Sequence, residues 1–398
     1  MKKRERISSR RLLLSSVMLA ACGTVQAASF GTYSVNPTDT DGQVVPGFYP
    51  NVEFDVGYDD NVLREENNTQ SSTFYLLKPE AQWIGAYGKH LLRFGYQGEF
   101  ARYANTDAEN YNDHFLGADA TLDLTQKLNI NAGAAYRWGH ENRGLASAVF
   151  PKPNRWQEWA AKVEALYGRR TATAQIGASY EHRDRIFTNN GQFTRDFDSD
   201  QITLIGFYNL GPKTQLLVEP SYTDINYPNS DLDNDVRKIL AGVTWSATAK
   251  TTGKLKVGHY NKDFADPALA DASGLAVDVE VVWEPKTYST VVLKVSRDAI
   301  DSAIGLGSSN YEASAASVDW THDLTELTQL QVGLGYENDE YDTGREDDYL
   351  DAYIGISRAI SRRVTVGARY DYGQRDSSDV GNDYDDNRIT LGVKTTFD

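Results

Sequence analysis

From about Tyr49 to the C-terminus the sequence repeats one pattern: roughly ten residues of alternating polarity, then a break, then another such stretch. Along the first stretch, 51–58, the apolar side carries Val52, Phe54, Val56 and Tyr58. Side chains of a β-strand point to alternate sides, so each stretch reads as an amphipathic strand. We count about eighteen such stretches, which predicts an all-β chain built from antiparallel hairpins.

The final stretch, Asn387 to Asp398, carries Ile389, Leu391, Val393 and Phe397 on one side. An amphipathic strand at the end of a chain needs a partner, and in a closed antiparallel barrel that partner is the first strand. The aromatic residue in the penultimate position resembles the terminal strand by which Gram-negative outer-membrane proteins reach the barrel assembly machinery. The sequence therefore predicts a closed barrel with that machinery as a partner.

The predicted connections alternate in length, with short ones after even-numbered strands and long ones after odd-numbered strands. This arrangement is typical of transmembrane barrels, which have short periplasmic turns and long extracellular loops. The expected long loops hold acidic runs, at 196–200, 231–235, 337–348 and 376–386. These runs are either simply solvated or weak bridging sites for divalent ions. The two runs that read Asp-x-Asp-x-Asp, 196–200 and 231–235, do not continue as an EF-hand loop.

The aromatic residues sort by strand end. Those next to the long connections are Tyr58, Tyr103, Tyr136, Trp138, Tyr180, Tyr222, Tyr336 and Tyr372. Those next to the short turns are Trp83, Tyr167, Tyr208, Trp245, Trp283 and Trp320. Two rings of amphipathic side chains, one at each interface, are expected where a barrel crosses a bilayer. A soluble sandwich would also alternate in polarity, but the repeat continues over more residues than sandwiches usually have.

Composition narrows the class of partner. The chain has 56 acidic and 40 basic residues, giving a net charge of -16, together with 24 Tyr and 7 Trp. Phosphate binding needs clustered Lys and Arg, so nucleic acid is not an expected partner. The many aromatic residues also argue against a disordered acidic chain.

The N-terminus predicts export. Residues 1–27 combine basic residues, an apolar run and small residues, as in a cleaved signal peptide. The run Leu19 to Cys22 also fits a lipoprotein box, so Cys22 is either discarded with the signal or lipidated. We expect residues 28–49 to form a short periplasmic lead and residues 50–398 to form the barrel in outer-membrane lipid. Pro79 and Pro220 lie inside predicted strands, where each marks a bulge or a misplaced strand boundary.

Charged residues occupy the faces opposite the apolar stripes, and in a barrel of this size these faces line an aqueous or plugged interior. The candidate lumen-lining residues are Arg93, Glu99, Arg137, Lys162, Glu164, Lys238, Lys256, Glu280, Lys294, Asp319, Arg369 and Lys394. They are either selectivity groups or solvated wall residues. Stacked aromatic rings in the lumen would favour sugar polymers, whereas opposed Arg and Asp would favour small solutes.

No catalytic or cofactor-binding pattern occurs. The six histidines are spread singly, and the chain lacks a nucleophile elbow, a phosphate loop and a cysteine cluster. We therefore expect no enzyme activity, no cofactor and no metal site.

The segment from Tyr49 to Val62, Tyr-Pro-Asn-Val-Glu-Phe-Asp-Val-Gly-Tyr-Asp-Asp-Asn-Val, resembles the start of the "putative β-barrel porin 2" family. The part from Gly57 to Val62 is its most specific portion. The resemblance implies an outer-membrane component of exopolysaccharide or capsule export, with polysaccharide as substrate and a periplasmic polysaccharide-export protein as partner. The alternatives are a general or substrate-selective diffusion porin and a structural barrel with a closed lumen.

Overall fold

The computed structural model describes residues 44–145, 150–169, 171–248, 250–302 and 308–397. The predicted signal peptide, Cys22 and the lead up to residue 43 lie outside this part of the chain. Within it, alternating sequences form eighteen antiparallel strands, as predicted. Two short 3-10 helices, η1 (Asp107–Glu109) and η2 (Gln192–Arg195), lie in connections.

The strands follow the chain in order. The first nine are β1 (Gly47–Asp59), β2 (Ser72–Tyr87), β3 (His90–Tyr103), β4 (Tyr111–Asp123), β5 (Leu128–His140), β6 (Arg155–Tyr167), β7 (Ala174–Phe187), β8 (Phe197–Gly211) and β9 (Thr214–Asn226). The other nine are β10 (Asn234–Thr248), β11 (Thr251–Phe264), β12 (Ala272–Lys286), β13 (Ser289–Asp301), β14 (Asn310–Asp323), β15 (Thr328–Tyr341), β16 (Glu346–Ala359), β17 (Val364–Ser377) and β18 (Tyr384–Thr396).

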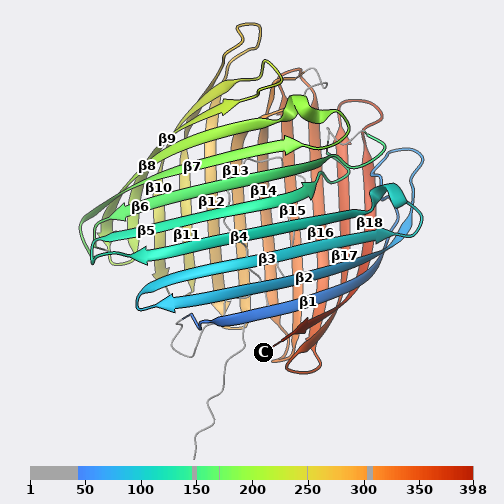
Figure 1. The fold of residues 1–398 in the computed structure, drawn as a ribbon, viewed down its shortest axis with the longest axis horizontal. Coiled ribbons are helices and arrows are strands. Elements are labelled where there is room, and N and C mark those ends of the chain that lie inside the picture. Colours follow the sequence, from blue (N-terminus) through green and yellow to red (C-terminus); the bar gives the residue numbers. More distant parts are fainter. Residues whose placement is uncertain (1–43, 146–149, 170, 249, 303–307, 398) are drawn as a thin grey trace, which may run out of the picture.

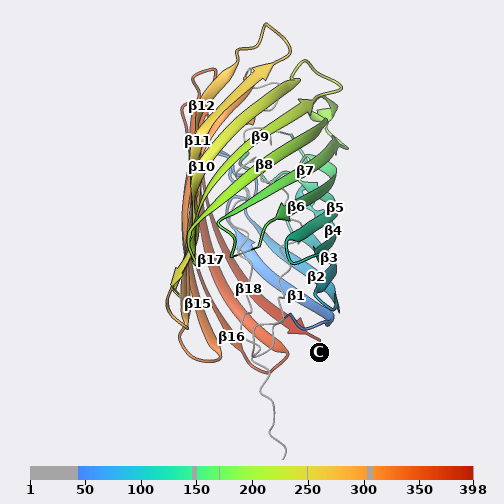
Figure 2. The same cartoon turned by 90° about the vertical axis from the view of Figure 1, so that its left-hand side faces the viewer.

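The sheet closes on itself. Each strand pairs with its neighbours in sequence, and β1 also pairs with β18, in a register that runs from Asn51 opposite Thr396 to Asp59 opposite Arg388. Figure 1 shows the blue β1 beside the red β18, and Figure 2 shows the same wall turned by 90°. The predicted partnership of the last strand with the first is confirmed, and it leaves no unpaired sheet edge.

Strands are longer than the roughly ten residues expected, at 13 to 16 residues. The extra length comes largely from the acidic runs that were expected in loops. Residues 337–341 belong to β15 and 346–348 to β16, so only a four-residue turn separates them. The connections after odd-numbered strands have 4 to 14 residues and those after even-numbered strands have 2 to 6. We call the two ends the long-loop end and the short-turn end.

The two prolines do not make bulges. Pro79 pairs with Val52 of β1, and Pro220 pairs with Ile239 of β10. On the other side of each strand the pairing resumes in unchanged register, from Leu77–Phe100 to Glu80–Gln97 in the first case. Each proline therefore interrupts the ladder toward one neighbour only, because it lacks a backbone N–H to donate there.

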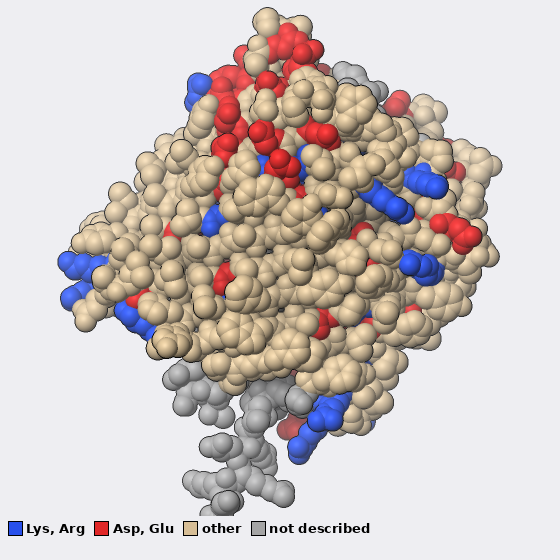
Figure 3. All heavy atoms as spheres, viewed as in Figure 1, with Lys and Arg blue, Asp and Glu red and all other residues tan. Residues whose placement is uncertain are grey.

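The outward face is apolar. On β8, for example, Ile202, Leu204 and Tyr208 are each at least half exposed, although they are large hydrophobic side chains. Figure 3 shows a largely uncharged band across the wall, with acidic side chains gathered at the top, where Figure 1 places the β9–β10 and β11–β12 connections. No helix within the described residues is long and apolar enough to cross a membrane.

Most predicted interface aromatics lie on this outward face, but Tyr103 does not. It packs against Phe74 and borders the interior, on the same side of β3 as Glu99. The prediction for Tyr103 was wrong because side chains alternate between the two faces of a strand. Phe100 faces outward, so Tyr103, three residues later, faces the interior.

Candidate functional site

The barrel encloses a cavity of about 1270 Å³ bordered by nearly every strand. Among its described lining residues, 17 are acidic and 14 are basic, whereas only four are tyrosines. Charges of both signs keep the wall hydrated. The interior is therefore a polar space rather than an apolar pocket or a stack of aromatic platforms.

Nine of the twelve candidate residues border this cavity. They are Glu99, Lys162, Glu164, Lys238, Lys256, Glu280, Lys294, Arg369 and Lys394. The other three, Arg93, Arg137 and Asp319, do not border it. Arg137 donates to Glu158 at 2.9 Å, Asp319 accepts from Tyr353 at 2.8 Å, and Arg93 lies opposite Asp119 in the β3–β4 register.

The wall from β9 to β13 is a lattice of paired charges. Lys256 contacts Glu219 and Asp278, each at 3.0 Å, and Lys254 contacts Asp278 at 2.9 Å. Further pairs join Lys238 to Asp298 and Lys262 to Asp301. Because each of these four lysines has a carboxylate neighbour, this part of the wall has no large excess of either sign.

A second charge cluster lies on β5, β6 and β7. The Glu158 carboxylate is almost fully buried and accepts from Arg137 at 2.9 Å and from Arg185 at 2.6 Å. A buried carboxylate needs such partners, since an unpaired charge in this position would be strongly destabilising. The cluster braces the wall from which the longest connection leaves.

That connection, 141–154, joins β5 to β6, and its residues 141–143 and Pro153 border the cavity. Its base is held by Glu141, which accepts from Arg195 at 2.5 and 2.9 Å and from Asn154 at 2.8 Å. The backbone N–H of Glu141 also donates to the Asn154 carbonyl at 2.8 Å. Arg195 belongs to the β7–β8 connection, so two adjacent connections are fastened together here.

The other end of the segment 141–145 is held by three arginines. Arg143 makes a two-pronged ion pair with Glu109, with N–O distances of 2.8 and 2.5 Å. Arg64 donates to the Arg143 carbonyl at 3.1 Å, and Arg375 donates to the Gly144 carbonyl at 2.7 Å. Glu109 comes from the β3–β4 connection, which leads into the neighbour of β5, whereas Arg64 in the β1–β2 connection and Arg375 in β17 lie farther along the wall.

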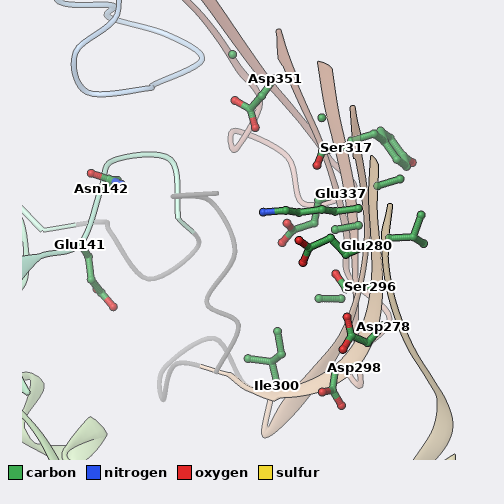
Figure 4. Close-up of a pocket in the computed structure, with 18 of the residues that line it drawn as sticks. Glu141, Asn142, Asp278, Glu280, Ser296, Asp298, Ile300, Ser317, Glu337 and Asp351 are labelled. Atoms are coloured by element: carbon green, nitrogen blue, oxygen red, sulfur yellow. The ribbon is translucent and has the colours of Figure 1, made fainter. Parts of the chain in front are cut away.

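Glu141, Asn142 and Arg143 border the cavity. Figure 4 shows Glu141 and Asn142 on one side of the open space and Asp278, Glu280 and Asp351 on the other. The segment therefore lies across from the β12–β16 wall.

Arg195 and Asn154 stabilise the ionised form of Glu141 at the base of this segment. Burial by itself would raise the pKa of the Glu141 carboxyl, but the hydrogen bonds and charge of Arg195, together with the Asn154 amide, outweigh it. The net result is a pKa below the ordinary value, so Glu141 is ionised at neutral pH. In the described part of the chain, no group of three or more His, Cys, Asp or Glu side chains is arranged to hold a metal ion.

Sequence reasoning missed the segment 141–145, here called the crossing segment, and the residues that anchor it. Arg64, Glu109, Arg143 and Gly144 lie in connections, where no periodicity indicates a direction. Lys254 and Asp278 were also missed, although a signal existed, because each lies two residues from a candidate, Lys256 or Glu280, on the same face.

Comparison with known proteins gives one family match. A sequence model of the family described as "putative beta-barrel porin 2" matches residues 36–397. No curated protein matches the chain.

Several solved structures are similar to this chain over most of its length. A bacterial polysaccharide outer membrane secretin is 9% identical, with a TM-score of 0.40, and the alignment covers 89% of this chain and 100% of that one. The outer membrane protein opdK from Pseudomonas aeruginosa is 11% identical, with a TM-score of 0.46 and coverage of 88% and 99%. OccAB4 from Acinetobacter baumannii is 12% identical, with a TM-score of 0.47 and coverage of 88% and 98%.

Proposed function

Because the chain belongs to the putative β-barrel porin 2 family, we propose that it is the outer-membrane conduit of an exopolysaccharide or capsular polysaccharide export system. It is a β-barrel porin of the outer membrane. In the proposed role it is passive: a periplasmic polysaccharide-export protein delivers the polymer at the short-turn end, and the driving force comes from the inner membrane.

The observation that carries this proposal is the polar cavity of about 1270 Å³. Eighteen strands enclose more space than inward side chains can fill, so a hydrated passage is expected. Small inward residues such as Ser296, Ala315 and Ser317 alternate with the charged ones and leave room along the wall. Sugar hydroxyls can exchange hydrogen bonds with such a wall without binding tightly, as transport requires.

A diffusion porin for small solutes is the second candidate, and a specific observation favours it. The lining has 31 charged side chains against four tyrosines, so stacked aromatic rings that would guide a sugar chain are scarce among the described residues. The segment 141–145 also lies across the cavity from the β12–β16 wall, and a passage narrowed there would suit small molecules.

A deletion experiment separates the two candidates. A strain without this protein is compared with the same strain complemented on a plasmid, and two quantities are measured: polysaccharide on the cell surface and in the medium, and the uptake rate of small sugars and amino acids. Loss of exported polysaccharide with unchanged uptake supports the conduit. Slower uptake with normal polysaccharide contradicts it and supports the diffusion porin.

A further inference from the structure

We infer that the segment 141–145 is a fixed constriction of the channel, with Asn142 at the opening, and that it limits the size of what passes. The inference rests on the proposed channel function and applies to either substrate. The residues of this segment lie outside the strands, so the alternating pattern does not assign them a role, and neither does the family match.

The distances show that the segment leaves the wall. Going around the wall from β5 to β17 means crossing six strand spacings, through β4, β3, β2, β1 and β18. At about 4.8 Å per spacing this path is roughly 29 Å. Gly144 lies four residues beyond the end of β5, and four residues reach at most about 14 Å. A segment that follows the wall would not approach Arg375, so the segment crosses the interior and meets the side chains that reach toward it.

Buried ion pairs and hydrogen bonds hold the segment 141–145 in place. The Arg143 and Glu109 side chains are 10% and 5% exposed, so their two-pronged pair is shielded from water and stronger than a surface ion pair. The Arg375–Gly144 hydrogen bond is likewise buried. With the Arg195–Glu141 pair at the base, the segment is fixed at both ends.

The backbone conformation and the packing at position 144 both require glycine. Gly144 has a φ of +87°, a conformation that L side chains rarely adopt. A Cβ at this position would lie 2.6 Å from the Tyr384 hydroxyl and 2.7 Å from Cδ of Arg64. Tyr384, at the start of β18, and Arg64, in the β1–β2 connection, therefore pack directly onto the segment.

The opening is polar. Figure 4 shows Glu141 and Asn142 across the cavity from Asp278, Glu280 and Asp351. The Glu141 carboxylate is paired with Arg195 and the Asp278 carboxylate with Lys254 and Lys256, so neither acts as a free charge in the opening. The Asn142 amide and the carboxylate oxygens of the facing wall can form hydrogen bonds with hydroxyls. The constriction therefore suits a hydroxyl-rich solute such as an uncharged sugar unit.

The test is single-channel recording of the full-length mature protein in planar bilayers. The variants Glu109→Gln and Arg375→Gln each remove an anchor of the segment. We expect conductance to rise by about 1.5-fold or more and larger poly(ethylene glycol) molecules to enter, because both scale with the open cross-section. The matched control is Asp347→Asn, which breaks a similarly buried two-pronged pair with Arg345 that does not touch the crossing segment.

A second variant covers the case in which an anchor variant fails to fold. Asn142→Cys, in a protein with Cys22→Ser, is treated with small thiol reagents of either charge. We expect a stepwise fall in current, with a larger effect on cation flow from the positively charged reagent. A current that is unchanged by the anchor variants and by modification of Cys at 142 overturns the inference. A wild-type protein that conducts no current contradicts the channel function itself, so the two failures are distinguishable.

Discussion

The Arg375 guanidinium donates from Nη1 to the carbonyl oxygen of Gly144 at 2.7 Å, across 231 residues of sequence. The bond joins β17 to the connection between β5 and β6. Because the barrel must close before these two residues meet, the crossing segment is positioned by tertiary structure rather than by its own sequence. Stability of the closed barrel and width of the passage are therefore coupled at this contact.

Replacing Gly144 with Ala tests how tightly the crossing segment is packed. The substitution forces a Cβ toward Tyr384 and Arg64 and places alanine at a positive φ. We expect a loss of about 2–4 kcal/mol in unfolding free energy, measured by urea titration in lipid vesicles, and a noisier single-channel current. The matched control is Gly344→Ala, which also has a positive φ (+83°) but meets no atom within 4 Å. Equal losses for the two variants would contradict the packing account.

Opposite faces of one strand should respond differently to a charge. Leu204 lies in the middle of β8 on the outward face, whereas its neighbour Thr203 borders the cavity. We expect Leu204→Arg to cost about 2–4 kcal/mol because it places a charge in hydrocarbon, and Thr203→Arg to cost much less. The fraction of protein that keeps its folded electrophoretic mobility in unheated samples measures the difference. A greater loss for Thr203→Arg would mean that the faces are reversed.

The seam, where β1 pairs with β18, should not tolerate a substitution that adds a methyl group. A Cβ at Gly57 of β1 would meet the fully buried Phe74 ring and lie 2.6 Å from the backbone oxygen of Ile389 in β18. We expect Gly57→Ala to destabilise the barrel by about 1–3 kcal/mol. At Gly206 of β8 a Cβ would meet only a Val218 methyl at 3.6 Å, so Gly206→Ala serves as the control in the same urea titration. Equal stability of the two variants would argue against a tightly packed seam.

Acid should weaken the base of the crossing segment. The pKa of Glu141 is below its ordinary value, so its ion pair with Arg195 contributes full stability above that ordinary value, near 4.3. The contribution is lost as the pH falls through the lowered pKa. We expect the difference in unfolding free energy between wild type and Glu141→Gln to be constant from pH 7 to about pH 5 and to shrink toward pH 3. A difference that grows on acidification would contradict this assignment.

The sequence predicted the barrel well because its determinants are local. Alternation along residues such as Ile202, Leu204 and Tyr208 already identifies the face that the bilayer covers, and the amphipathic last strand implies closure. Strand length was underestimated because acidic runs such as 337–341 look like loop sequence, although the wall continues into water beyond the bilayer.

The candidate site was only partly predictable, for a physical reason. Lumen-facing residues such as Lys256 and Glu280 follow from strand parity, and they do border the cavity. Arg143 and Gly144 gain their role from contacts with Glu109 and Arg375, which lie far away in sequence. No periodic signal reports such contacts, so the direction in which a long connection folds becomes visible only in three dimensions.

Single-channel conductance of the purified mature protein in planar bilayers, with and without added polysaccharide, tests the central claim most directly. The account predicts a steady open current that the polysaccharide blocks reversibly, because a sugar chain would occupy the passage beside Asn142. An open current that polysaccharide leaves unchanged would contradict the export role and favour a diffusion porin. The absence of any current would contradict the claim that the lumen is an open channel.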